Sequence, residues 1–134
     1  NCINFQKDNL SEIVNARTFC LYEDIEKIKK LGLAKGGSLE NAIVVKDDKV
    51  LNDGGLRSEK EFVNHKILDL AGDFLLSGYR VLGKVRCYHG GHELTNLFLR
   101  SLMKSNTYFD FFEVDQFDKD KIDIKQSINI AVNA

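Results

Sequence analysis

Hydrophobic residues recur with helical spacing over residues 58–78, and this segment carries the strongest periodic signal in the chain. At about 100° per residue, its apolar side chains fall on one wide arc of a helix. Ser58 and Glu61 have the spacing of a capping box, and Gly78 stands where a helix stop is expected. The sequence therefore predicts one amphipathic helix over residues 58–78. The apolar arc comprises Val63, Ile67, Leu68, Leu70, Ala71, Phe74 and Leu75.

The segments before this helix predict a small β-α-β-β unit. Residues 16–20 predict a short strand or turn, and residues 22–31 predict a short helix with an apolar residue at every third position. A glycine-rich turn follows at residues 34–39. Two β-branched runs, at residues 42–45 and 49–51, then predict a hairpin.

Three other stretches alternate between hydrophobic and polar residues, as strands do: residues 1–10, 79–88 and 108–117. A second amphipathic helix is predicted to begin at or near His92, directly after two glycines. Together these elements predict an α+β fold, a two-layer sandwich with helices on one face of a mixed or antiparallel sheet and a small βαβ insert at about residues 16–45.

Composition narrows the class of protein. The 134 residues are enough for one domain, and 43% hydrophobic with 29% charged residues is typical of soluble globular proteins. A net charge of -1 without a basic block excludes a nucleic-acid surface. No apolar run reaches the roughly 18–20 residues of a membrane span. The three cysteines lack metal-ligand spacing and indicate reduced thiols in a cytoplasmic protein.

Two histidines are candidates for chemistry. His65 and Asp69 are four residues apart on the polar arc of the long helix, a spacing at which two side chains can bind one metal ion. The same spacing is also typical of a solvated surface pair, and it leaves both interpretations open. His92 lies at a helix N-terminus, where it is either a capping or loop histidine or a group beside developing negative charge.

Seven motifs occur in the order known from one enzyme family: ARTF at 16–19, GLAKGGS at 32–38, NAIVV at 41–45, VLN at 50–52, GLR at 55–57, EFVNHKILD at 61–69 and GHELTN at 91–96. Through them the chain resembles the second half of the UDP-3-O-acyl-N-acetylglucosamine deacetylases. These are zinc-dependent hydrolases of lipid A biosynthesis in Gram-negative bacteria. Several motifs in one order make the resemblance far more specific than any single motif.

The resemblance implies roles for particular residues. His65 and Asp69 would be ligands of Zn²⁺, and Lys66 would reach the substrate. Thr18 would offer its hydroxyl to the oxyanion of the tetrahedral intermediate, and Phe19 would pack on the sugar. The expected reaction is metal-assisted hydrolysis of an amide.

His92 would be the protonated partner near the leaving amine, and Asp73 would hydrogen-bond it and favour its charged form. The insert at about residues 16–45 resembles the part of the family that forms a channel for the substrate's acyl chain. The candidate lining residues are Ile25, Ala34, Gly37, Ser38, Ala42 and Val44.

The chain departs from the family in the number of metal ligands. A catalytic zinc takes three protein ligands, and in the family the third is a histidine of the first domain, beside a glutamate that acts as general base. His89 lies three residues before His92 and is not that ligand. The chain also begins with Asn1 instead of Met.

We therefore expect a C-terminal fragment, with most of the second domain at residues 1–117 and a tail at 118–134. Its partners would be the small-molecule substrate and the missing N-terminal domain. Alone, it should bind zinc weakly and lack deacetylase activity. The alternative is a non-catalytic module that holds an acyl chain or lipid-like ligand, and zinc content before and after substitution of His65 or Asp69 distinguishes the two.

Overall fold

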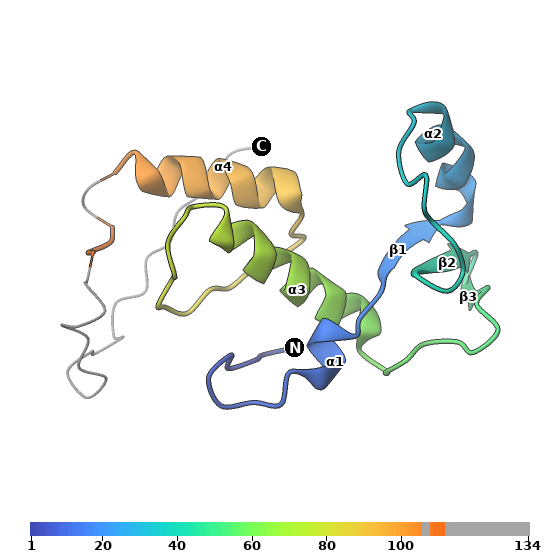
Figure 1. Ribbon diagram of the computed structural model, residues 1–134, viewed down its shortest axis with the longest axis horizontal. Coiled ribbons are helices and arrows are strands. Elements are labelled where there is room, and N and C mark those ends of the chain that lie inside the picture. Colours follow the sequence, from blue (N-terminus) through green and yellow to red (C-terminus); the bar gives the residue numbers. More distant parts are fainter. Residues whose placement is uncertain (106–107, 112–134) are drawn as a thin grey trace. The chain divides into compact units, whose positions relative to one another are not determined.

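The computed structural model describes residues 1–105 and 108–111 (Figure 1). The chain forms two compact units that divide between Leu68 and Asp69, and each is described by itself. The division falls within helix α3, Glu61–Leu75, which the sequence predicts as the long amphipathic helix.

The first unit contains a mixed three-stranded sheet in the order β1-β2-β3. Strand β1, Thr18–Leu21, runs parallel to β2, Ala42–Lys46, and the short helices η1, Tyr22–Asp24, and α2, Ile25–Lys30, lie between them in sequence. Strand β3, Lys49–Val50, pairs with β2 in antiparallel fashion. The predicted β-α-β-β unit and the α+β class are confirmed.

The side chain of Asn52 fastens the sheet to the turn that precedes β2. Its Oδ1 accepts a hydrogen bond from the Val44 N–H at 3.0 Å, and its Nδ2 donates to the carbonyls of Leu39 and Ala42 at 2.6 and 2.8 Å. Asn52 is buried, so each of these polar atoms needs a partner and has one. The amide thus holds the strand that runs beside β1.

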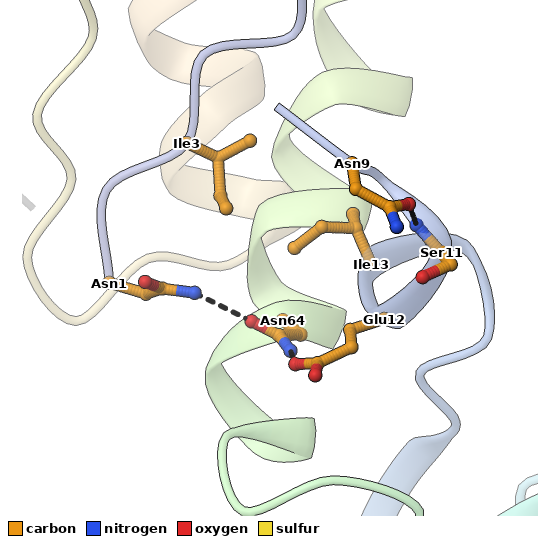
Figure 2. Close-up of a pocket in the computed structure, with 7 residues that line it drawn as sticks. All are labelled: Asn1, Ile3, Asn9, Ser11, Glu12, Ile13 and Asn64. Carbon is orange, nitrogen blue, oxygen red and sulfur yellow. Dashed lines mark hydrogen bonds between the residues drawn. The ribbon is translucent and has the colours of Figure 1, made fainter. Parts of the chain in front are cut away.

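Polar residues fill part of the core of the first unit. Ile13, from helix α1, Ser11–Val14, and Ile43 are fully buried, and so are Glu61 and Asn64 of α3. Figure 2 shows Asn64 accepting a hydrogen bond from Asn1 Nδ2 at 2.8 Å. The predicted apolar arc of α3 therefore describes only part of the surface that this helix buries.

The predicted capping box at Ser58 is wrong. The carboxylate of Glu61 accepts hydrogen bonds from the N–H of Arg57 and from Arg17. The Ser58 hydroxyl accepts a long hydrogen bond, 3.4 Å, from the side chain of Asn64. The local pattern assigned the Glu61 side chain to the helix start, but this side chain pairs instead with Arg17, 44 residues earlier in the sequence.

The predicted edge strand at residues 1–10 is also absent. The N–H groups of Lys7 and Asp8 donate to the Asn4 carbonyl at 3.1 and 2.9 Å, and the Asn4 N–H donates to Asp8 Oδ2 at 2.7 Å. Short polar side chains that bond nearby backbone favour turns over strands. This local pairing explains why the alternation around Ile3 and Phe5 does not produce a strand.

The second unit is built around the end of α3 and helix α4, His92–Met103. Phe74 and Leu99 are buried there, and the rings of Phe74 and Phe98 lie 5.9 Å apart. The N–H of Gly78 donates to the Leu75 carbonyl at 3.0 Å, and Gly78 has a φ of 80°, which closes the helix as predicted. The predicted start of the second helix at His92 is confirmed.

Residues 79–88 do not form the predicted strand. Val81 and Val85, on the face that the alternation assigned to the core, are 48% and 45% exposed. Within the described residues, no other strand pairs with this stretch. Residues 108–111 are likewise irregular, and the rest of the predicted strand at 112–117 and the tail at 118–134 lie outside the described residues.

Candidate functional site

Strand β1 and helix α3 bring three of the predicted site residues together in the first unit. The ring centroid of Phe19 lies 6.2 Å from that of His65, and the Lys66 Nζ lies 5.5 Å from the centroid of Phe19. Phe62 packs edge-on against Phe19 at 5.0 Å and steadies its ring. Thr18, the first residue of β1, precedes Phe19 and is exposed.

The tautomer of His65 follows from its contact with the backbone. Nδ1 lies 3.2 Å from the carbonyl oxygen of Ala16. A carbonyl oxygen only accepts hydrogen bonds, so Nδ1 carries a proton, and a metal ion would bind the ring through Nε2. Histidines that bind metals usually have this arrangement, with the second ring nitrogen donating to a carbonyl or carboxylate. The orientation of His65 therefore fits a metal ligand.

A buried ion pair lies directly beside this contact. Glu61 is fully buried, and its Oε1 accepts hydrogen bonds from the Arg17 backbone N–H at 3.0 Å and from Arg17 Nε at 2.8 Å. Arg17 Nη2 and the Arg57 N–H donate to Oε2 at 3.1 and 2.6 Å. The bond from the Arg17 side chain is the largest cause that lowers the pKa of Glu61 to about 2.

Local sequence patterns give no sign that Arg17 and Glu61 form a pair. Both residues lie inside the motifs at 16–19 and 61–69, but the pair spans 44 positions and has no periodic signature. A charged residue that is expected at a helix start gives no sign that it will be buried. The signal that could have pointed to the pair is position, because Arg17 directly precedes Thr18 and Glu61 lies four residues before His65 on the same helix.

A second cluster joins α3 to α4 within the second unit. His92 Nδ1 lies 2.9 and 3.0 Å from the two carboxylate oxygens of Asp73, so Nδ1–H donates to this carboxylate. His92 Nε2 lies 3.9 Å from Asp69 Oδ2. The imidazole is 69% exposed, while the side chains of Asp69 and Asp73 are 17% and 13% exposed. An accessible histidine is thus held by largely covered carboxylates.

The candidate metal ligands of this chain are His65 and Asp69. No group of three or more His, Cys, Asp or Glu side chains within residues 1–105 and 108–111 is placed to hold a metal ion. His65 and Asp69 belong to the same helix and supply an imidazole nitrogen and a carboxylate oxygen, both of which are zinc donors. Their donor chemistry fits a zinc ion, and their assignment as ligands stays a prediction.

The six predicted lining residues all belong to the β-α-β part of the first unit. Val44 is buried and Ile25 and Ala42 are half-buried, whereas Ala34, Gly37 and Ser38 lie in an exposed turn. The hollow in Figure 2 lies elsewhere in the first unit and is lined mainly by polar residues. Its lining comprises Asn1, Ile3, Asn9, Ser11, Glu12, Ile13 and Asn64.

Among the described residues, no helix combines the length and apolar character that a membrane crossing requires.

Comparisons with known proteins give one family. The model of the family described as "LpxC: UDP-3-O-acyl N-acetylglycosamine deacetylase" matches residues 2–104. A UDP-3-O-acyl-N-acetylglucosamine deacetylase of Legionella pneumophila (strain Corby) is 51% identical over 106 residues, which are 75% of this chain and 35% of that protein. The protein of the same name from Campylobacter lari is 40% identical over 116 residues, 86% of this chain and 40% of the relative.

A third relative of that name, from Glaesserella parasuis serovar 5, is 38% identical over 121 residues, which cover 90% of this chain and 38% of the relative. The chain thus spans 35 to 40% of the length of these three proteins.

Proposed function

Because the chain belongs to the UDP-3-O-acyl N-acetylglycosamine deacetylase family, we propose that its residues form one part of the active site of a zinc-dependent deacetylase. The substrate is UDP-3-O-acyl-N-acetylglucosamine, and the reaction belongs to lipid A biosynthesis. The matched segment, residues 2–104, includes every candidate site residue, which supports the transfer of the family's activity to this site.

The contact of His92 with Asp73 is the single observation that carries the proposal. The carboxylate accepts the Nδ1 proton at 2.9 Å, which fixes the orientation of the ring. Since the imidazole is 69% exposed, a bound substrate can reach it. A protonated histidine in this position can act as general acid for the leaving amine.

His65 and Asp69 would hold the zinc ion, through Nε2 and a carboxylate oxygen. When bound, the ion supplies Lewis-acid polarisation of the acetyl carbonyl and of a water molecule. We propose that a third ligand and the general base come from residues outside these 134. The chain's own contribution is then two ligands, the acid and the substrate contacts.

The remaining candidates bind and orient the substrate. The Thr18 hydroxyl would donate to the oxyanion, Phe19 would pack on the sugar, and Lys66 would contact the substrate close to Phe19. The oxygen of a water molecule, whose proton would go to the general base, would bond to the acetyl carbon. The C–N bond would then break, and His92 would give its proton to the leaving nitrogen. The products are acetate and the free amine.

We propose that the β-α-β unit receives the acyl chain. Three of its candidate lining residues, Ile25, Ala42 and Val44, present apolar side chains that are at least half-buried. A hydrocarbon chain would bind there because binding removes apolar surface from contact with water. The more exposed candidates in this lining are Ala34, Gly37 and Ser38.

Acetate release tests the proposed acid. In the protein with every residue that its gene encodes, His92→Ala should lower kcat by about 10²–10⁴-fold. Asp73→Asn should lower kcat less, because the histidine remains but loses its charged partner. His89→Ala is the matched control, since His89 is an exposed histidine three residues away, and it should leave kcat unchanged. Full activity of the His92 variant would contradict the proposed role.

Zinc content tests the proposed ligands. Purified protein should lose most of its zinc on substitution of His65 or Asp69 by Ala, whereas His89→Ala and Asp53→Ala should keep it. Asp53 is an exposed carboxylate outside both clusters, which makes it a suitable control. Equal zinc in all five proteins would contradict the ligand assignment and favour the non-catalytic binding module.

A further inference from the structure

We propose that Glu61 is a positioning residue for His65 and that it acts through the peptide group joining Ala16 to Arg17. The inference rests on the proposed function in one respect, the role of His65 as a metal ligand. It assigns to Glu61 an effect on metal affinity, beyond its contribution to the fold.

The peptide group is bound at both ends by side chains of α3. Its carbonyl, from Ala16, accepts the Nδ1 proton of His65 at 3.2 Å. Its N–H, from Arg17, donates to Glu61 Oε1 at 3.0 Å. Glu61 and His65 are four residues apart on one helix, so their side chains emerge one turn apart on the same face. The helix thereby fixes the plane of this peptide.

The carboxylate of Glu61 is itself held in place. Arg17 Nε and Nη2 bind its two oxygens at 2.8 and 3.1 Å, and the Arg57 N–H donates to Oε2 at 2.6 Å. Arg17 Nη2 also donates to the Gly55 carbonyl at 2.8 Å. Glu61 is 0% exposed, so no water competes for these bonds. The carboxylate therefore cannot turn away from the peptide N–H without losing several charge-assisted bonds.

A negative charge at the N–H end of a peptide strengthens its carbonyl as an acceptor, because hydrogen bonds in a chain polarise one another. A stronger acceptor at Nδ1–H increases the electron density at Nε2 and fixes the ring orientation. In many metal sites a carboxylate performs this task by direct contact with the histidine. Here Glu61 performs it through the intervening peptide between Ala16 and Arg17.

Zinc affinity of Glu61→Gln tests the proposal. The full-length protein is titrated against a chromophoric chelator to give the zinc dissociation constant. Gln keeps the size of the side chain and removes its charge, and zinc should bind at least about tenfold more weakly, as for other outer-shell partners of metal ligands. Asn52→Ala is the control, because Asn52 is buried in the same unit and lacks contact with this peptide.

The possible results distinguish the positioning role of Glu61 from the assignment of His65 as a metal ligand. Weaker zinc binding in Glu61→Gln, with less than a twofold change in Asn52→Ala at comparable loss of stability, supports the positioning role. An unchanged zinc affinity in Glu61→Gln overturns it, and so does an equal loss in both variants. If His65→Ala keeps wild-type zinc affinity, the ligand assignment itself fails, whatever Glu61→Gln does.

A measurement on the wild-type protein covers the case in which Glu61→Gln fails to fold. Nitrogen-15 NMR of the His65 ring should show Nδ1 protonated with and without zinc, and the Arg17 amide proton should resonate far downfield, as expected for a bond to a carboxylate. An Nε2–H tautomer of His65, or an ordinary Arg17 amide shift, would overturn the proposal.

Discussion

Arg17 and Glu61 form a charged pair in which both carboxylate oxygens accept hydrogen bonds, and both side chains are largely removed from water. The side chains are 9% and 1% exposed. A buried pair of this kind stabilises little relative to a well-packed apolar pair, but the loss of one partner leaves an uncompensated charge. Substitution at either position therefore has a large effect.

We expect Arg17→Met to lower the free energy of unfolding by about 3–5 kcal/mol, because Glu61 would lose its cationic partner while it stays buried. Urea denaturation measures this change. Arg80→Met is the control, since Arg80 is exposed, and it should stay within about 0.5 kcal/mol of wild type. Equal stability of the two variants would show that Arg17 does not compensate the buried carboxylate.

The same pair predicts a loss of stability in acid. Hydrogen bonds from the Arg17 side chain are the largest cause that lowers the pKa of Glu61 from 4.5 to about 2 in the folded protein. Between these values the unfolded chain binds the proton and the folded one does not, so stability falls as pH falls from about 4.5 to 2. The full loss is about 3 kcal/mol.

Urea denaturation at several pH values measures this window, with Arg17→Met as the comparison. The variant lacks the main cause of the lowered pKa, so its stability should depend less on pH between about 4.5 and 2. A wild-type and variant profile of equal slope would contradict the assignment.

For single residues, the sequence identified side chains suited to chemistry better than it identified which residues contact each other. His65 and His92 stand out by helical spacing and by position at a helix start, and the structure places each against a specific acceptor. The role of Glu61 could not be predicted, because its partner lies 44 residues away and local patterns assign the same residue to a cap. Family membership, not geometry, carries the assignment of the metal ligands.

At the scale of elements, two glycines of the second unit serve opposite purposes. Gly78 has a φ of 80°, which an L side chain adopts only with strain, whereas Gly72 lies within α3 and a Cβ there would meet no atom within 4 Å. One glycine is required by the backbone, and the other merely weakens its helix.

We expect Gly78→Ala to destabilise the protein by about 1–2 kcal/mol and Gly72→Ala to stabilise it by about 1 kcal/mol. Thermal unfolding of both variants beside wild type measures the two effects. The pair is its own control, since the same chemical change is made six positions apart. A change of equal sign in both would contradict the backbone explanation.

The two long helices and the β-α-β-β unit could be predicted from local pattern, but the irregular backbone at residues 79–88, where alternation predicts a strand, could not. Alternation specifies which side chains share a face, while a strand also needs a neighbour for its backbone groups. Val81 and Val85 are exposed, and no described strand pairs with their segment. The alternating pattern is present, but among residues 1–105 and 108–111 no strand lies beside it to pair with its backbone groups.

At the scale of the whole molecule, the chain spans 35 to 40% of the length of three relatives, and its candidate ligands number two. We expect the 134-residue chain alone to release no acetate from the substrate and to bind zinc far more weakly than the protein with every residue its gene encodes. A catalytic zinc site takes three protein ligands, which gives the physical reason. Acetate assays and chelator titration measure both quantities.

The comparison includes a folding control, because loss of zinc binding could also follow from unfolding. Urea denaturation should show a cooperative transition for the chain alone. Turnover by the chain alone would contradict the proposal that a ligand and the base come from other residues.

The peptide between Ala16 and Arg17 has a consequence for how this site tolerates mutation. The atoms that meet Glu61 and His65 are main-chain atoms, so a change of side chain at position 16 leaves both hydrogen bonds available. At position 17, only proline removes the N–H itself. A mutational screen would therefore detect Glu61 and His65 more readily than the group that links them. Arg17→Pro removes the N–H together with the guanidinium that pairs with Glu61, so it reveals the role of the N–H only beside Arg17→Met, which removes the guanidinium alone.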